Sequence, residues 1–342
     1  MKRSYTEPFI PRSLEPYYDE QARLAHSNMA HKTLDTLLKY MPPTQIVDNG
    51  KNRVRFAELK PRYRDYNPNE ALLLVLPFAQ GWKPLMFLRA LYLQNSAAPN
   101  MRMIIFPGDT LREPAFSLTK EELEKVKNGD LRPIAERRAQ AVRTLGIAET
   151  AINGYSGGAT EAQYIADVLS DYSQLSSLAI LEPTNAEERT KKALKKDFQG
   201  KNIFESLRTV RTQLKALSDA EVPAVNEALG WVHLIPDYVQ FAKDVLFSKA
   251  NKALQSGLVG NDLAERTANI MRAQPRARVF IGNAEFSRIA RSDALQPHVS
   301  ELQSEFGDRE AHLTVEGYGH EMGDQIVVHG LLGKAALSRA KK

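Results

Sequence analysis

The chain of 342 residues contains no cysteine, which excludes disulfides, thiolate metal ligands and a cysteine nucleophile. It also lacks a hydrophobic run of membrane-spanning length. The longest such run, from Ala71 to Ala79, is far below the ~20 residues that a spanning helix needs. The charged start at Met1–Pro8 has no apolar segment behind it, which argues against a secretory signal. We therefore expect a soluble, cytoplasmic protein.

Nucleotide- and metal-binding signatures are missing as well. The chain has no G-x-x-x-x-G-K-[ST] motif and no G-x-G-x-x-G after a strand, and Asp324 prevents His320-Glu321 from forming H-E-x-x-H. The 46 Lys and Arg residues exceed the 41 Asp and Glu residues by only five, too few to indicate nucleic-acid binding. We expect no cofactor, no metal and no nucleic-acid partner, and the sequence indicates no oligomeric state.

Apolar segments alternate regularly with helical ones. The composition, 43% hydrophobic and 25% charged, is that of a packed globular protein. A hairpin is expected at 44–47 and 53–59, around an Asn-Gly turn. Further strands are expected at 71–77, 101–106, 150–154, 178–181, 277–281 and 311–315, and helices at 84–94, 131–145, 159–169 and 324–336. This alternation predicts an α/β fold with a doubly wound, mostly parallel sheet.

We expect three parts in the chain. Residues 1–43 form an N-terminal helical arm, and 44–184 with 274–342 form the α/β core. Residues 185–273 interrupt the alternation with helical stripes that include Trp231, Tyr238 and Phe241. Such a segment cannot join the sheet, so it is expected to pack over it as a helical cap. Its first part, 189–215, carries nine Lys and Arg against two Asp and Glu, which indicates a solvated face or a patch that attracts an anionic substrate.

The most informative motif is Gly154-Tyr155-Ser156-Gly157-Gly158, a G-x-S-x-G between an expected strand and an expected helix. A serine on such a tight turn is lifted clear of the sheet. Its Oγ then lies near the helix N-terminus, where unpaired N–H groups stabilise developing negative charge. We interpret Ser156 as a nucleophile; the alternative is a serine that only caps the following helix.

A serine nucleophile needs a general base. His320 is the best-placed histidine, because it follows the last expected strand in Glu316-Gly317-Tyr318-Gly319-His320. The glycines allow this loop to bend, so that the imidazole could reach the serine. The other histidines lie in or beside expected helices and strands, and we assign none of them to catalysis.

With these residues in order, the chain resembles the α/β-hydrolases over roughly 44–340, and the elbow sequence is similar to that of some lipases and esterases. The resemblance implies a third catalytic residue after the penultimate strand, where Gly282-Asn283-Ala284-Glu285 makes Glu285 the acid. Asp293 and Glu182 are alternatives. It also implies an oxyanion hole made by the backbone amides of Gly157 and Ala79, with Phe78 or Gln80 as alternative second donors.

The catalytic set predicted is thus Ser156, His320 and Glu285. It indicates a serine hydrolase that cleaves a carboxylic ester, or else an amide or thioester, through an acyl-enzyme. The substrate would be a small-molecule or lipid-like ester. Two other functions remain open from the sequence: an acyltransferase, and a binding or assembly protein that retains the fold with an idle triad.

Overall fold

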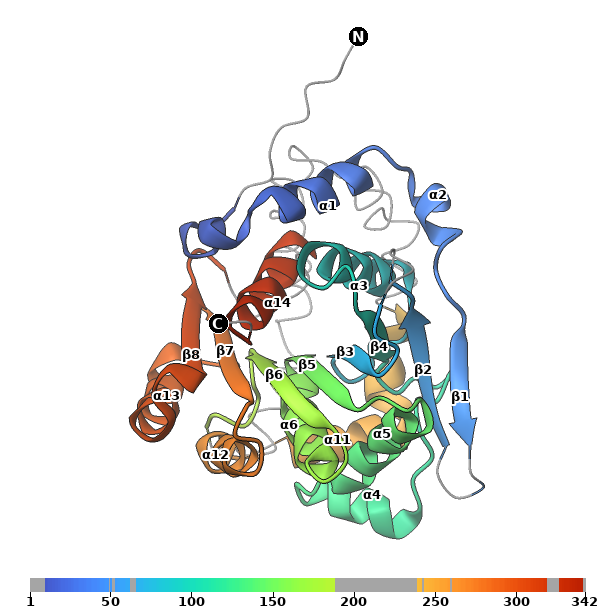
Figure 1. The fold of residues 1–342 in the computed structure, drawn as a ribbon. Helices are drawn as coiled ribbons and strands as arrows, with labels where there is room; N and C mark the ends of the chain where they lie inside the picture. Colours follow the sequence, from blue (N-terminus) through green and yellow to red (C-terminus); the bar gives the residue numbers. More distant parts are fainter. Residues whose placement is uncertain are drawn as a thin grey trace.

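The computed structural model describes residues 10–48, 50, 53–61, 66–187, 239–241, 243–258, 260–318 and 326–340. Within these residues, eight strands form one sheet in the order β1-β2-β4-β3-β5-β6-β7-β8 (Figure 1). The strands are β1 (Thr44–Asp48), β2 (Arg53–Leu59), β3 (Glu70–Val75), β4 (Arg102–Phe106), β5 (Glu149–Tyr155), β6 (Gln174–Leu181), β7 (Arg278–Ala284) and β8 (Glu310–Val315).

The direction of pairing agrees with the prediction from the sequence. The β1–β2 hairpin is antiparallel, and β2 pairs antiparallel with β4. Every other pairing between neighbours, from β4–β3 through β7–β8, is parallel. Because parallel strands share a direction, the carboxyl ends of β3, β5, β6 and β7 meet at one edge of the sheet. We call this edge the carboxyl edge.

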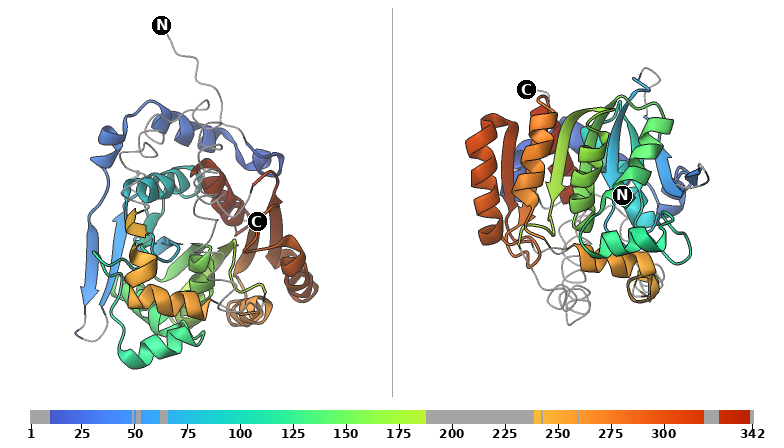
Figure 2. Two further views of the ribbon diagram at one scale, coloured as in Figure 1. Left: turned by 180° about the vertical axis from the view of Figure 1, so that it is seen from behind. Right: turned by 90° about the horizontal axis from the view of Figure 1, so that it is seen from below.

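Helices cover both faces of the sheet (Figures 1 and 2). One face carries α3 (Pro84–Ala97) and α14 (Ile326–Ala340), and the other carries α5 (Arg132–Thr144), α6 (Gly157–Leu169), α12 (Leu263–Ala273) and α13 (Ser292–Phe306). The sequence of β3 is continuously apolar because both of its faces are buried. Leu72 and Leu74 belong to the hydrophobic cluster that includes residues of α3, whereas Leu73 and Val75 belong to the cluster that includes residues of α6.

The segment expected as an N-terminal arm is helical where it is described. It contains a 3₁₀ turn at Arg12–Tyr17, then α1 (Glu20–Ala30) and α2 (Leu34–Leu38). Asp19 and Thr33 cap the two α-helices by accepting hydrogen bonds from first-turn amides. Helix α1 lies over α3 and α14 (Figure 1).

The described residues contain two helices that the sequence did not predict, one before α5 and one after β7, and they include the end of the inserted segment. Helix α4 (Lys120–Lys127) was not predicted, and neither was α13. The return of the insertion contains α11 (Lys249–Gly257), which lies beside α4 (Figure 2), and then α12. Helix α12 packs with the layer that covers the sheet, although it falls inside the predicted cap of 185–273. Much of that cap, 188–238, lies outside the described residues.

None of the helices in the described part of the chain has both the length and the apolar character needed to cross a membrane.

Candidate active site

Ser156 stands between β5 and α6 on a turn that admits little besides glycine on either side. A methyl group on Gly154 would lie 2.4 Å from the Gly158 carbonyl oxygen, and one on Gly158 would lie 2.4 Å from the carbonyl oxygen of Val75. Both distances are impossible without moving the backbone. The two outer glycines of G-x-S-x-G are therefore required by the close approach of the strand, the turn and the helix.

The serine itself is held in a strained conformation. Ser156 has a φ of 56°, in the left-handed region that non-glycine residues seldom adopt. Its amide donates to the Leu181 carbonyl oxygen at 2.8 Å, which fixes the turn to the end of β6. Although serine is a favoured cap residue, its side chain makes no capping hydrogen bond to α6. The interpretation of Ser156 as a simple helix cap is therefore not supported.

The loop after β3, which includes the predicted second oxyanion donor, touches this turn. A methyl group on Gly157 would lie 3.1 Å from the Phe78 ring, so the loop and the helix N-terminus are in direct contact. Ala79 is buried and has a φ of 60°. The Gln80 amide already donates to the Pro77 carbonyl oxygen at 3.2 Å, which makes Gln80 the weakest of the three candidate donors. The structure thus brings the loop that contains Ala79 to the amide end of α6.

The acid predicted from the G-x-x-E pattern lies on the surface. Glu285, just after β7, is exposed, and its carboxylate accepts a hydrogen bond of 2.9 Å from the Gly317 amide, in the loop that leads to position 320. Asp293 is exposed at the start of α13, where hydrogen bonds from Arg291 lower the pKa of its carboxyl. An acid that orients a histidine is usually buried, and neither of these carboxylates is.

Glu182, the other alternative, is completely buried. It follows β6 directly with a φ of 55°, and its amide donates to the Gly282 carbonyl oxygen at 2.8 Å. Its carboxylate accepts hydrogen bonds from the Ala284 amide and from the Ser287 hydroxyl. Ser287 was not a candidate from the sequence, where a lone serine after a strand carries no signal. The residues that follow β5 and β6, Ser156 and Glu182, thus lie at the carboxyl edge on neighbouring strands.

The predicted base, His320, lies outside the described residues, and so do 189–215, Trp231 and Tyr238. Three of the other histidines have asparagine partners, and the ring centroid of one of them, His329, also lies 5.8 Å from that of Tyr155 in the elbow. Nε2 of His312 contacts Asn283 Oδ1 at 2.8 Å, and burial lowers the pKa of this imidazole. His329 contacts Asn153, and His298 contacts Asn261. Among the described residues, no group of three or more His, Asp or Glu side chains is arranged to hold a metal ion.

Known proteins match this chain in structure but not in sequence. No family model and no curated protein matches it. A thermophilic esterase from Thermogutta terrifontis matches with a TM-score of 0.52 and 12% identity, over 88% of this chain and 100% of the other. The thioesterase domain from the curacin biosynthetic pathway matches with a TM-score of 0.51 and 15% identity, over 87% and 99%. An alpha/beta hydrolase from a deep-sea metagenome library matches with a TM-score of 0.50 and 12% identity, over 84% and 96%.

The chain has the α/β-hydrolase fold. The resemblance that the sequence suggested is confirmed at this level, including the mostly parallel sheet. In this α/β-hydrolase fold, the turn at Ser156 and the loop at Ala79 both lie at the carboxyl edge, where ligands bind to open parallel sheets. At sequence identities of 12% to 15%, these matches show a shared fold only.

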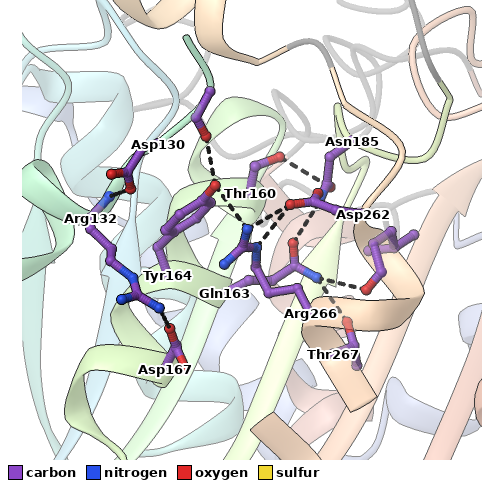
Figure 3. Close-up of polar contacts among 12 residues, drawn as sticks. Asp130, Arg132, Thr160, Gln163, Tyr164, Asp167, Asn185, Asp262, Arg266 and Thr267 are labelled. Carbon is purple, nitrogen blue, oxygen red and sulfur yellow. Dashed lines mark hydrogen bonds and ion pairs between the residues drawn. The ribbon is translucent and has the colours of Figure 1, made fainter. Parts of the chain in front are cut away.

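Buried polar side chains connect α6 of this α/β-hydrolase fold to both ends of the insertion (Figure 3). Asn185, where the insertion begins, donates to Gln163 of α6 at 2.9 Å and to Asp262, where the insertion returns, at 2.7 Å. Thr160 donates to Asn185 at 3.2 Å, and Gln163 donates to the Thr267 hydroxyl of α12 at 2.8 Å. Helix α6, which follows Ser156, is thereby joined to the residues at both ends of the predicted insertion.

Arg266 of α12 extends this network to Tyr164 of α6, the residue after Gln163 (Figure 3). It donates to Asp262 at 2.7 Å and to the Tyr164 hydroxyl at 2.9 Å, and its guanidinium carbon lies 3.6 Å from the centroid of the Tyr164 ring. The Tyr164 hydroxyl donates to the Gly129 carbonyl oxygen at 2.6 Å. Arg266 therefore combines an ion pair, a hydrogen bond and a cation–π contact at one position.

Arg266→Ala is expected to lower the free energy of unfolding by about 1–3 kcal/mol, because it removes the cation–π contact and three charge-assisted hydrogen bonds from a half-buried site. Arg272 on the same helix is the matched control, since its pair with Glu305 is exposed to solvent. Urea unfolding followed by circular dichroism measures both. An equal loss in the two variants would contradict the importance given to the Arg266 contacts.

Proposed function

We propose that the protein is a serine hydrolase that cleaves a carboxylic ester through an acyl-enzyme. The observation that carries the proposal is the conformation of Ser156: a left-handed, buried serine at the first turn of α6 whose side chain leaves the helix uncapped. Backbone strain of this kind, about 1–3 kcal/mol, persists where the surrounding structure enforces it, and it is concentrated at functional sites. A serine that only caps a helix needs no such strain.

The proposed chemistry follows from the groups around the turn. Ser156 Oγ attacks the substrate carbonyl carbon while His320 takes its proton, and the carbonyl oxygen becomes an oxyanion. The amides of Gly157 and Ala79 donate to this oxyanion. The carbon–oxygen bond of the ester then breaks, and His320 returns the proton to the leaving alcohol. Water, activated by the same imidazole, releases the acid and restores the serine.

A carboxylate is proposed to orient the imidazole of His320. Glu285 is the residue implied by the family pattern, and its contact with the Gly317 amide ties it to the loop that leads to His320. Burial supports Glu182 instead, because a carboxylate removed from water interacts more strongly with an imidazolium. The hydrogen bonds from Ala284 and Ser287 also hold the Glu182 carboxylate in one orientation. We therefore propose Glu182 as the orienting acid and treat Glu285 as its competitor.

The substrate is proposed to be a small-molecule or lipid-like ester enclosed by the insertion. The described stems of the insertion are fixed to α6 through Asn185 and Asp262, next to the turn that holds Ser156. A cap at this place would exclude water from the oxyanion hole and strengthen its hydrogen bonds. Structural neighbours include an esterase and a thioesterase, which supports acyl transfer but does not choose between an ester and a thioester.

Labelling with a fluorophosphonate probe, followed by a chain-length series of p-nitrophenyl esters, tests the proposal. A stoichiometric adduct on the peptide that contains Ser156, together with turnover of at least one ester, would support a hydrolase. Adduct formation with turnover only when an acceptor alcohol is added would indicate an acyltransferase. Absence of both would favour the fold serving in binding or assembly.

A further inference from the structure

A buried ion pair joins α5 to α6 one helical turn after the proposed oxyanion donor Gly157. Arg138 of α5 and Glu161 of α6 are each almost completely buried, and Nη1 of the arginine lies 2.9 Å from Oε2 of the glutamate. The two atoms are in ion-pair contact without the alignment of a hydrogen bond. Burial lowers the pKa of Arg138 and raises the pKa of Glu161, whereas the attraction between the two opposes both shifts; the buried carboxylate of Asp109 also supports the charge of Arg138 and disfavours that of Glu161.

Such a pair adds little to stability. Removing two charges from water costs about as much as their attraction returns, and apolar residues of similar volume often replace buried pairs without loss. The burial of Arg138 and Glu161 therefore calls for a role in geometry. Their other contacts indicate what that geometry is.

Arg138 joins the two segments that supply the proposed oxyanion donors. Its partner Glu161 lies on α6, the helix that begins with the donor Gly157. On its other side, Arg138 Nη2 donates to the Pro107 carbonyl oxygen at 3.3 Å, and its guanidinium lies 5.5 Å from the centroid of the Phe106 ring. The guanidinium thus bridges α6 and the end of β4.

The end of β4 in turn supports the loop that contains Ala79. The Gly108 amide donates to the Gln80 carbonyl oxygen at 2.8 Å. The contact is so close that a methyl group on Gly108 would lie 2.3 Å from the Pro77 carbonyl oxygen and 2.8 Å from the Ala79 nitrogen. A continuous path of contacts therefore runs from Gly157 through Glu161 and Arg138 to the loop around Ala79.

We infer that Arg138 and Glu161 are positioning residues that set the spacing between the two backbone donors of the oxyanion hole. This inference rests on the proposed function. Each donor nitrogen must lie about 2.7–3.1 Å from the developing oxyanion, and a shift of a few tenths of an ångström matters because these hydrogen bonds weaken steeply with distance and angle. A rigid ionic bridge between the helix and the loop keeps both in place before the substrate arrives.

The test replaces both charges at once, as Arg138→Met with Glu161→Leu, since either change alone leaves an unpaired buried charge. We expect kcat for a p-nitrophenyl ester to fall by about 10- to 100-fold, less than the loss of a whole oxyanion donor causes. KM should stay within about two-fold, because substrate binding does not use the oxyanion contacts. The inhibition constant of a trifluoromethyl ketone, whose adduct with serine carries an oxyanion, should rise by a factor similar to the fall in kcat.

Arg137→Met with Glu122→Gln is the matched control. Arg137 is the neighbouring residue on α5, equally buried, and its 2.7 Å ion pair with Glu122 leads to α4 rather than to α6. The control should keep kcat within about two-fold of wild type. Arg138→Lys is a milder second variant, because it retains the charge but cannot reach Glu161 and Pro107 together, and it should show a smaller loss of kcat.

Amide hydrogen exchange provides a readout that does not depend on catalysis. The Arg138 variants should exchange faster at both 77–81 and 156–161, and the Arg137 control should not. Exchange equal to wild type in both segments would overturn the inference whether or not the protein hydrolyses esters. Faster exchange with unchanged kcat would overturn it too. A wild type that neither binds the fluorophosphonate nor turns over esters would instead refute the proposed function.

Discussion

Ser156→Ala is expected to lower kcat for ester hydrolysis by about 10³- to 10⁶-fold and to abolish labelling by a fluorophosphonate. The variant loses the oxygen that forms the acyl-enzyme but keeps the backbone amides proposed to stabilise the oxyanion. The melting temperature should hardly change, because alanine at a φ of 56° is strained to the same degree as serine.

Labelling is read by intact-protein mass spectrometry, and kcat by release of p-nitrophenol. Ser177→Ala is the control, since Ser177 is also buried and its hydroxyl donates a hydrogen bond to the Ala336 carbonyl oxygen of α14, far from the turn at Ser156. It should label and turn over like wild type. A labelled Ser156→Ala protein would show that the nucleophile lies elsewhere.

Glu182→Gln is expected to lower kcat by about 10²- to 10⁴-fold, because a neutral amide neither stabilises the imidazolium nor selects the correct histidine tautomer. Glutamine preserves the size of the side chain; its carbonyl oxygen can still accept from the Ala284 amide, and its NH₂ group can donate to the Ser287 hydroxyl, so the fold should survive. Glu285→Gln and Asp293→Asn should stay within about ten-fold of wild type, since both carboxylates face water, where the interaction of a charge with an imidazolium is weak.

The three variants are compared through kcat on one ester, with circular dichroism to confirm folding. The reverse pattern, a crippled Glu285→Gln beside an active Glu182→Gln, would restore the assignment made from the G-x-x-E sequence. Wild-type activity in all three variants would mean that none of these three carboxylates orients the base.

Much of the fold was predictable because its cause is local. Each buried parallel strand is a short apolar run, and the Asn-Gly turn marks the hairpin. Helix α4 was missed although Thr119 and Glu122 form a capping box, a pattern that can be read from the sequence. Helix α13 contains Pro297, which conceals its helical character. Helix α6 begins at Gly157, two residues earlier than expected, because contacts of the turn with β3 hold two glycines in helical conformation.

The candidate site was predictable only in part. Ser156 stands in a motif whose spacing has a mechanical reason, and the structure gives that reason in the contacts of Gly154 and Gly158. The difference between Glu182 and Glu285 could not be predicted, since burial depends on how β6 and β7 lie side by side. The same holds for Arg138 and Glu161, which are 23 positions apart and look like ordinary surface charges of two amphipathic helices.

The three left-handed residues Ala79, Ser156 and Glu182 also bear on how this protein can be engineered for heat resistance. Methods that relax unusual backbone would replace each with glycine, and at Ser156 and Glu182 that would remove the side chains proposed for catalysis. Ala79 differs, because its proposed contribution is a backbone amide that glycine retains. Relief of strain there would be partly offset by the greater freedom of glycine in the unfolded chain. Gains in thermostability are therefore better sought far from the carboxyl edge, at the exposed positions of β1 and on the surface of α4.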